Sequence, residues 1–69
     1  MTQKELNYVE DAIGHEGTII KEIEDAIENL EDETLVTFME NELKTHNKMQ
    51  KDLKKLLEVK ANEWSTYIR

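Results

Sequence analysis

Apolar side chains recur through the first half of the chain at alternating steps of three and four residues. The series runs over Leu6, Val9, Ile13, Glu16, Ile20, Ile23, Ile27 and Leu30. All of these except Glu16 are apolar, and the spacing places them on one face of an α-helix. A second series at every seventh residue widens this stripe to the width typical of a helix packed in a bundle: Ala12, Ile19 and Ala26. The pattern predicts a helix over residues 3–30.

The second half of the chain repeats the pattern and predicts a helix over residues 33–66. Its expected contact positions are Leu35, Met39, Glu42, His46, Met49, Leu53 and Leu56, flanked by Val36, Leu43, Leu57 and Trp64. The five-residue step from Leu30 to Leu35 breaks the phase, so one continuous coiled-coil helix is disfavoured and a turn at about 30–33 is predicted. In this turn, Asn29 suits a left-handed helix exit and Asp32 can accept hydrogen bonds from the next helix's free amides.

Composition makes the fold class all-α and the chain a single domain over residues 1–69. The sequence has no proline, no cysteine and two glycines, which fits helices far better than strands and turns. Two helices form one interface, and the stripes are wider than that interface can cover. We therefore expect an antiparallel helical hairpin that forms a homodimer, as a ferritin-like four-helix bundle.

The charge balance narrows the class of partner. Nine basic residues against sixteen acidic ones give a net charge of −7, which argues against nucleic acid or an anionic membrane surface as the main partner. The negative charge lies in residues 1–32, while residues 33–69 are near neutral, so the two halves favour each other over their own copies. We expect a cytoplasmic protein with no enzymatic activity, because no catalytic motif is present.

Three polar residues occupy positions where the pattern calls for apolar side chains: Glu16, Glu42 and His46. A buried carboxylate must be paired, protonated, solvated or metal-bound. A structural ion pair that fixes helix register is the favoured interpretation. The alternative is a di-metal site shared across the dimer and holding iron, manganese or zinc, although Glu42 precedes His46 by four residues where di-iron bundles use three. Gly14 and Gly17 bracket Glu16 and indicate either close helix approach or a tolerated weak point.

The stretch from Asp11 to Leu53 resembles the ferritin-like spore-coat F group of small helical proteins. The resemblance rests on Glu16, the acidic turn at residues 31–33, and the run from Glu42 to His46. It implies a ferritin-like hairpin or bundle with a structural role in the spore coat, and the wider superfamily implies metal carboxylate sites. In that comparison, Glu16 takes the first-helix carboxylate position, His46 the second-helix histidine position, and Glu42 the second-helix acid position with a one-residue offset.

Overall fold

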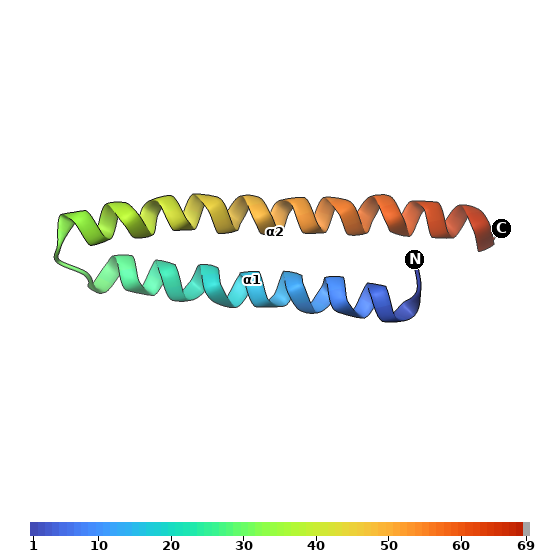
Figure 1. The fold of residues 1–69 in the computed structure, drawn as a ribbon, viewed down its shortest axis with the longest axis horizontal. Helices are drawn as coiled ribbons and strands as arrows, with labels where there is room; N and C mark the ends of the chain where they lie inside the picture. The colour runs from blue at the N-terminus through green and yellow to red at the C-terminus, as the bar shows by residue number, and fades with distance from the viewer. Residues whose placement is uncertain (69) are drawn as a thin grey trace.

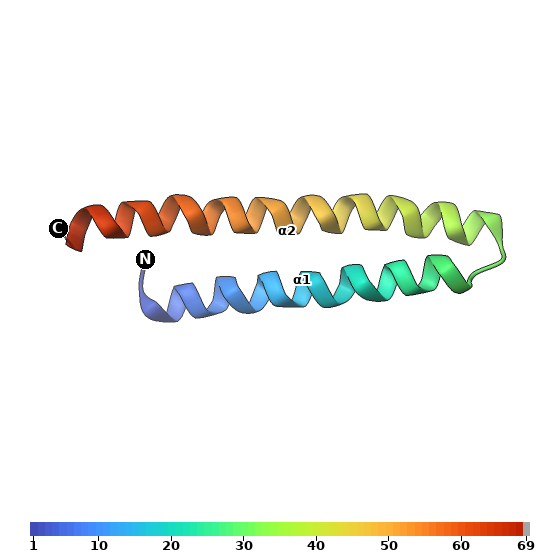
Figure 2. The same cartoon turned by 180° about the vertical axis from the view of Figure 1, so that it is seen from behind.

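The chain folds into two antiparallel α-helices joined by a three-residue turn (Figure 1). A computed structural model describes the backbone of residues 1–68 and the side chains of residues 1–60. Helix α1 covers Gln3–Asn29 and helix α2 covers Glu33–Ile68. The view from behind shows that α2 continues beyond the start of α1 (Figure 2). The all-α hairpin and its turn are confirmed, whereas Trp64, predicted to flank the contact positions of the second helix, lies outside the described side chains.

Local hydrogen bonds fix the start of α1. Thr2 is its N-cap, and the Thr2 hydroxyl accepts a hydrogen bond from the Glu5 backbone N–H at 3.1 Å. The Glu5 carboxylate in turn accepts one from the Thr2 backbone N–H at 2.8 Å. This reciprocal capping box satisfies amides that have no partner within the helix.

In the turn, the predicted role of Asp32 is confirmed and the predicted role of Asn29 is contradicted. Asp32 accepts a hydrogen bond from the Leu35 backbone N–H at 3.0 Å, as expected for the residue that opens α2. The predicted left-handed exit at Asn29 is wrong, because no residue other than glycine has a positive φ angle among those described. The chain leaves α1 through Leu30 in an extended conformation instead, with φ −83° and ψ 139°. The Asn29 side chain donates to the Asp25 carbonyl at 2.7 Å.

Side-chain burial and two cross-helix hydrogen bonds identify the residues through which the helices face each other, here called the inner positions. On α1 these are Leu6, Val9, Ile13, Glu16, Ile20, Ile23 and Ile27, which confirms the predicted series. On α2 they are Val36, Met39, Leu43, His46, Gln50, Leu53 and Leu57. The predicted α2 series was therefore wrong at Leu35, Met49 and Leu56, which are exposed, and at Glu42, whose place among the inner positions is taken by Leu43.

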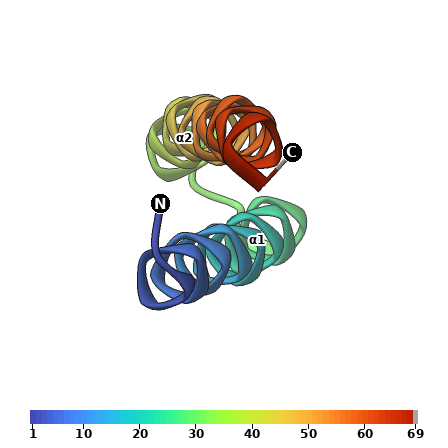
Figure 3. The ribbon, with the colours of Figure 1, turned by 90° about the vertical axis from the view of Figure 1, so that its right-hand side faces the viewer.

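The hairpin is one layer of two helices (Figure 3), and it has almost no core of its own. Among the residues with described side chains, the buried ones are Ile23 and Glu16. The radius of gyration is 16.1 Å, against about 11 Å for a compact domain of this length. The accessible surface of 5730 Å² compares with about 4,500 Å² for a folded monomer of this mass. The described part of the chain contains no helix long and apolar enough to cross a membrane.

Candidate functional site

The polar residues predicted at the contact between the helices do come together. Glu16 on α1 and His46 on α2 are joined by a hydrogen bond of 2.6 Å between Glu16 Oε2 and His46 Nδ1. An ionised carboxylate can only accept, so in the pair with an ionised Glu16 it is the imidazole Nδ1–H that donates. The side chains of Glu16 and His46 are 12% and 20% exposed, so this contact is a largely desolvated link between the helices.

Glu42 approaches the other ring nitrogen of the same histidine. Its Oε2 lies 3.6 Å from His46 Nε2, which is an ion-pair distance but too long for a hydrogen bond. The Glu42 side chain is 40% exposed, so water weakens this contact. The three residues therefore form one strong cross-helix bond and one weaker contact within α2.

A second polar link, one turn further along α2, was not predicted. The Gln50 side-chain amide donates to the Ile13 backbone carbonyl on α1 at 3.2 Å. Gly17 makes room for it, because a Cβ at Gly17 would lie 3.1 Å from Gln50 Nε2. At Gly14 an added Cβ would meet nothing within 4 Å. Close approach of the helices thus explains Gly17 but not Gly14. The inner position of Gln50 could have been predicted from the sequence, because Gln50 is seven residues from both Leu43 and Leu57.

The cluster of Glu16, Glu42 and His46 does not by itself fit a metal ion. Within the part of the chain whose side chains are described, no group of three or more His, Cys, Asp or Glu residues is placed to hold one. Both nitrogens of His46 face carboxylates of the same chain, so the imidazole is used as a bridge between the two acids. The metal alternative therefore needs ligands from a second copy and stays a prediction.

The two broad sides of the hairpin differ sharply in chemistry. Consecutive helical residues are rotated by about 100°, so residues just before the inner positions lie on one side of each helix and residues just after them lie on the other. The two antiparallel helices are related by a twofold axis perpendicular to the layer. Rotation about this axis keeps each side of the layer on itself. The residues that precede the inner positions therefore lie on the same side in both helices.

We call the side formed by the preceding residues the apolar face, and the side formed by the following residues the polar face. The apolar face carries Glu5, Tyr8, Ala12, His15, Ile19, Glu22 and Ala26 from α1, and Leu35, Phe38, Glu42, Thr45, Met49, Asp52 and Leu56 from α2, followed by Val59. The polar face carries Asn7, Glu10, Gly14, Gly17, Lys21, Glu24 and Glu28 from α1, and Thr37, Glu40, Lys44, Asn47, Lys51, Lys54 and Glu58 from α2. The six large apolar residues Tyr8, Leu35, Phe38, Met49, Leu56 and Val59 are 44–63% exposed.

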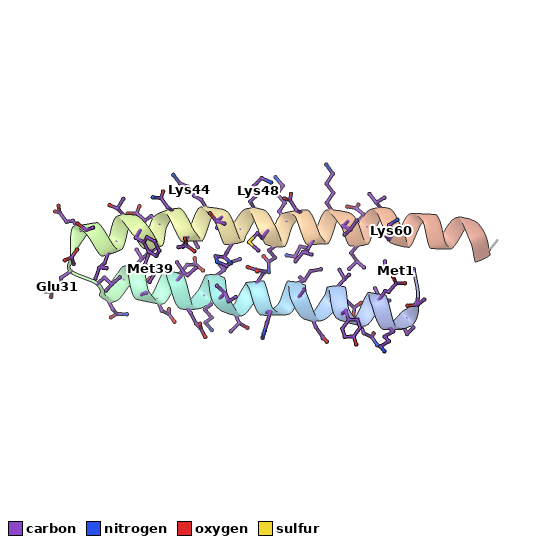
Figure 4. The ribbon with its side chains drawn as sticks, viewed as in Figure 1. Met1, Glu31, Met39, Lys44, Lys48 and Lys60 are labelled. Atoms are coloured by element: carbon purple, nitrogen blue, oxygen red, sulfur yellow. The ribbon has the colours of Figure 1, made fainter. Side chains whose placement is uncertain are left out.

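Lys44 and Lys48 project from the side of α2 directed away from α1 (Figure 4). Lys48 forms an ion pair of 2.8 Å with Asp52, one turn along the same helix. The hydrogen bond between these two side chains raises the pKa of Lys48 and lowers that of Asp52. Lys48 is thus paired with an acid of its own helix and not with the acidic helix α1.

Comparison of the chain with protein-family models, with curated proteins and with solved structures gave no match.

Proposed function

We propose that this chain is a structural interaction protein that works as a homodimer, in which two hairpins pack through their apolar faces into a four-helix bundle of ferritin-like type. The observation that carries the proposal is the contrast between the two sides of the hairpin. Large apolar side chains collect on the apolar face, whereas the polar face carries only charged, amide, hydroxyl and glycine positions. One-sided apolar exposure of this kind is typical of a binding surface.

The size of the apolar face agrees with a second copy as its partner. A large side chain has roughly 200 Å² of surface, and six of them are about half exposed here. Each chain therefore offers about 600 Å², and a symmetric pair would bury about 1,200 Å², the lower end of the range for specific interfaces. A hairpin of 69 residues with so little buried side-chain surface needs such an external partner, because small folds without disulfides commonly depend on self-association.

Sedimentation equilibrium tests the proposal directly. The expected mass is twice the 8.2 kDa of the chain. Phe38→Ala removes a side chain of the apolar face and should shift the equilibrium toward monomer. Thr37→Ala is the matched control, because it trims the neighbouring exposed residue on the polar face and should leave the equilibrium unchanged. A folded wild-type monomer with a cooperative thermal transition would contradict the proposal, and so would equal effects of the two substitutions.

The resemblance to the spore-coat group extends the proposal to a place in the cell. A small bundle without catalytic machinery suits a structural role in a layered protein coat, and the support for this extension is the resemblance alone. Fractionation of spores from the host, with an antibody against the chain, should recover it with the coat proteins. Its recovery in the soluble core fraction alone would contradict the coat role and leave the dimer untouched.

A further inference from the structure

The apolar face also indicates how the two hairpins are oriented. A twofold axis in the interface plane can run parallel to the helices, which places both turns at the same end and lays α1 of each chain over α2 of its partner. An axis perpendicular to the helices instead places the turns at opposite ends and lays α1 over α1 and α2 over α2. Both arrangements are isologous and bury the same face.

Charge separates the two arrangements. Helix α1 contains eight acidic residues and two lysines, a net charge of −6. Helix α2 contains six acidic residues and six lysines, a net charge of zero. The opposite-end arrangement stacks two helices of charge −6 on each other, whereas the same-end arrangement places each of them over a neutral helix. The net charge of the whole helices therefore disfavours the opposite-end arrangement at long range. The charges at the contact itself add no distinction, because Lys44, Lys51 and Lys54 lie on the polar face.

The sizes of the side chains along the apolar face independently favour the same-end arrangement. The cross-helix bonds of Glu16 with His46 and of Ile13 with Gln50 define which residues of α1 and α2 lie at the same height. Ala12 is then level with Met49, and Ala26 lies between the heights of Leu35 and Phe38.

A twofold axis parallel to the helices leaves the position of each residue along that axis unchanged. It therefore sets each alanine of one chain opposite large side chains of the other. Alternation of small and large residues across an interface fills space evenly. In the opposite-end arrangement, alanine-bearing α1 faces its own copy and the large residues of α2 face one another. That arrangement leaves the α1 contact underfilled and the α2 contact overfilled.

We infer that the dimer has its twofold axis parallel to the helices, with both turns at the same end and each acidic α1 packed over the partner's α2. This inference rests on the proposed homodimer. The partner it specifies is a second copy of this chain in one orientation.

Spin labels on single introduced cysteines distinguish the two arrangements, because the native chain has no cysteine. Glu31 in the turn and Lys44 near mid-height of the polar face are both exposed. In the same-end dimer, the two labels of Glu31→Cys should lie within about two helix diameters, roughly 20 Å. In the opposite-end dimer they would be separated by about the length of α1, roughly 40 Å. Lys44→Cys is the matched control, since its labels lie at similar heights in both arrangements.

A short distance for Glu31→Cys, with a defined distance between the Lys44→Cys labels, supports the inference. A long distance for Glu31→Cys, with a defined distance between the Lys44→Cys labels, overturns the orientation but leaves the homodimer standing. The absence of any distance between labels for both variants, together with a monomeric mass, overturns the proposed function itself. Asn7→Cys, at the open end of the hairpin, repeats the discrimination if Glu31→Cys fails to fold, with a short distance expected and a long one refuting the orientation.

Discussion

The cross-helix bond between Glu16 and His46 can be measured with a double-mutant cycle. The variants are Glu16→Leu, His46→Leu and the double replacement. Unfolding by urea, followed by far-ultraviolet circular dichroism at one fixed protein concentration and neutral pH, gives their free energies of unfolding. The fixed concentration matters because association adds to the apparent stability. The quantity of interest is the coupling free energy between the two sites.

The structure sets the expected size of this coupling. A hydrogen bond to a charged group contributes about 1.5–3 kcal/mol when it is well buried. Side-chain exposures of 12% for Glu16 and 20% for His46 leave water partial access, so we expect a coupling of about 1–2 kcal/mol. Glu16→Leu alone should change stability little, because burial of a leucine returns about 1.5–3 kcal/mol. The double variant should be more stable than either single one, since it leaves no unpaired polar group.

A second cycle supplies the control. Glu42 contacts the same histidine at 3.6 Å and is 40% exposed, so its coupling with His46 should be at most about 0.5 kcal/mol, as in exposed pairs one helical turn apart. The two couplings should therefore differ by at least a factor of two. If the coupling of Glu16 with His46 is no larger than that of Glu42 with His46, the interpretation of the buried bond as the main polar link between the helices is wrong.

Three further predictions follow from individual positions. Gly14→Ala, whose added Cβ meets no atom within 4 Å, should raise the unfolding free energy by about 0.5–1 kcal/mol. Gly17→Ala should gain less in the same urea titration, because its Cβ would lie 3.1 Å from a side-chain amide of α2; equal gains would refute the close approach. Thr2→Ala should speed amide exchange in the first turn of α1 and cost about 1 kcal/mol. The hydrogen bond from the Thr2 backbone lowers the pKa of the Glu5 carboxyl below its ordinary 4.5. The capping contribution is therefore complete above pH 4.5 and lost as the pH falls through the lowered folded value. First-turn protection, taken relative to the exchange rate of an unstructured chain at the same pH, that stays unchanged in acid would contradict this. Iron(II), manganese(II) and zinc should leave the melting temperature unchanged on the structural interpretation. A rise that disappears in Glu16→Leu would establish the metal alternative, since a ligand at a hundredfold excess over its dissociation constant stabilises by about 2.7 kcal/mol.

The sequence was sufficient to predict the hairpin because the phase of the apolar pattern changes between Leu30 and Leu35. The predicted helices, 3–30 and 33–66, end within two residues of the observed ones. Asp32 performs its expected role at the start of α2. The contact between Glu16 and His46 was also predictable, since each sits in an apolar series and pairing their heights places them together.

The inner surface of α2 could not be predicted, and the reason is physical. Two overlapping apolar stripes run along that helix, one through Leu35, Met49 and Leu56 and the other through Leu43 and Leu57. One partner helix covers only one of them, and periodicity does not say which. The choice depends on how the short turn docks the helices and on the fit of Gln50 beside Gly17. Of the predicted series, Met39, His46 and Leu53 are inner as expected, whereas Leu35, Met49 and Leu56 lie on the apolar face.

Sparse burial also bears on the lifetime of the protein in a cell. Among the residues with described side chains, Ile23 is the one apolar residue that is buried, so the separate hairpin opens at little cost. Proteases cleave opened chains, and the rate of loss follows the fraction of molecules that are open. The proposed homodimer would protect paired chains, so newly made copies would be most vulnerable while their concentration is too low for pairing. The rate of synthesis would then govern how long each copy survives.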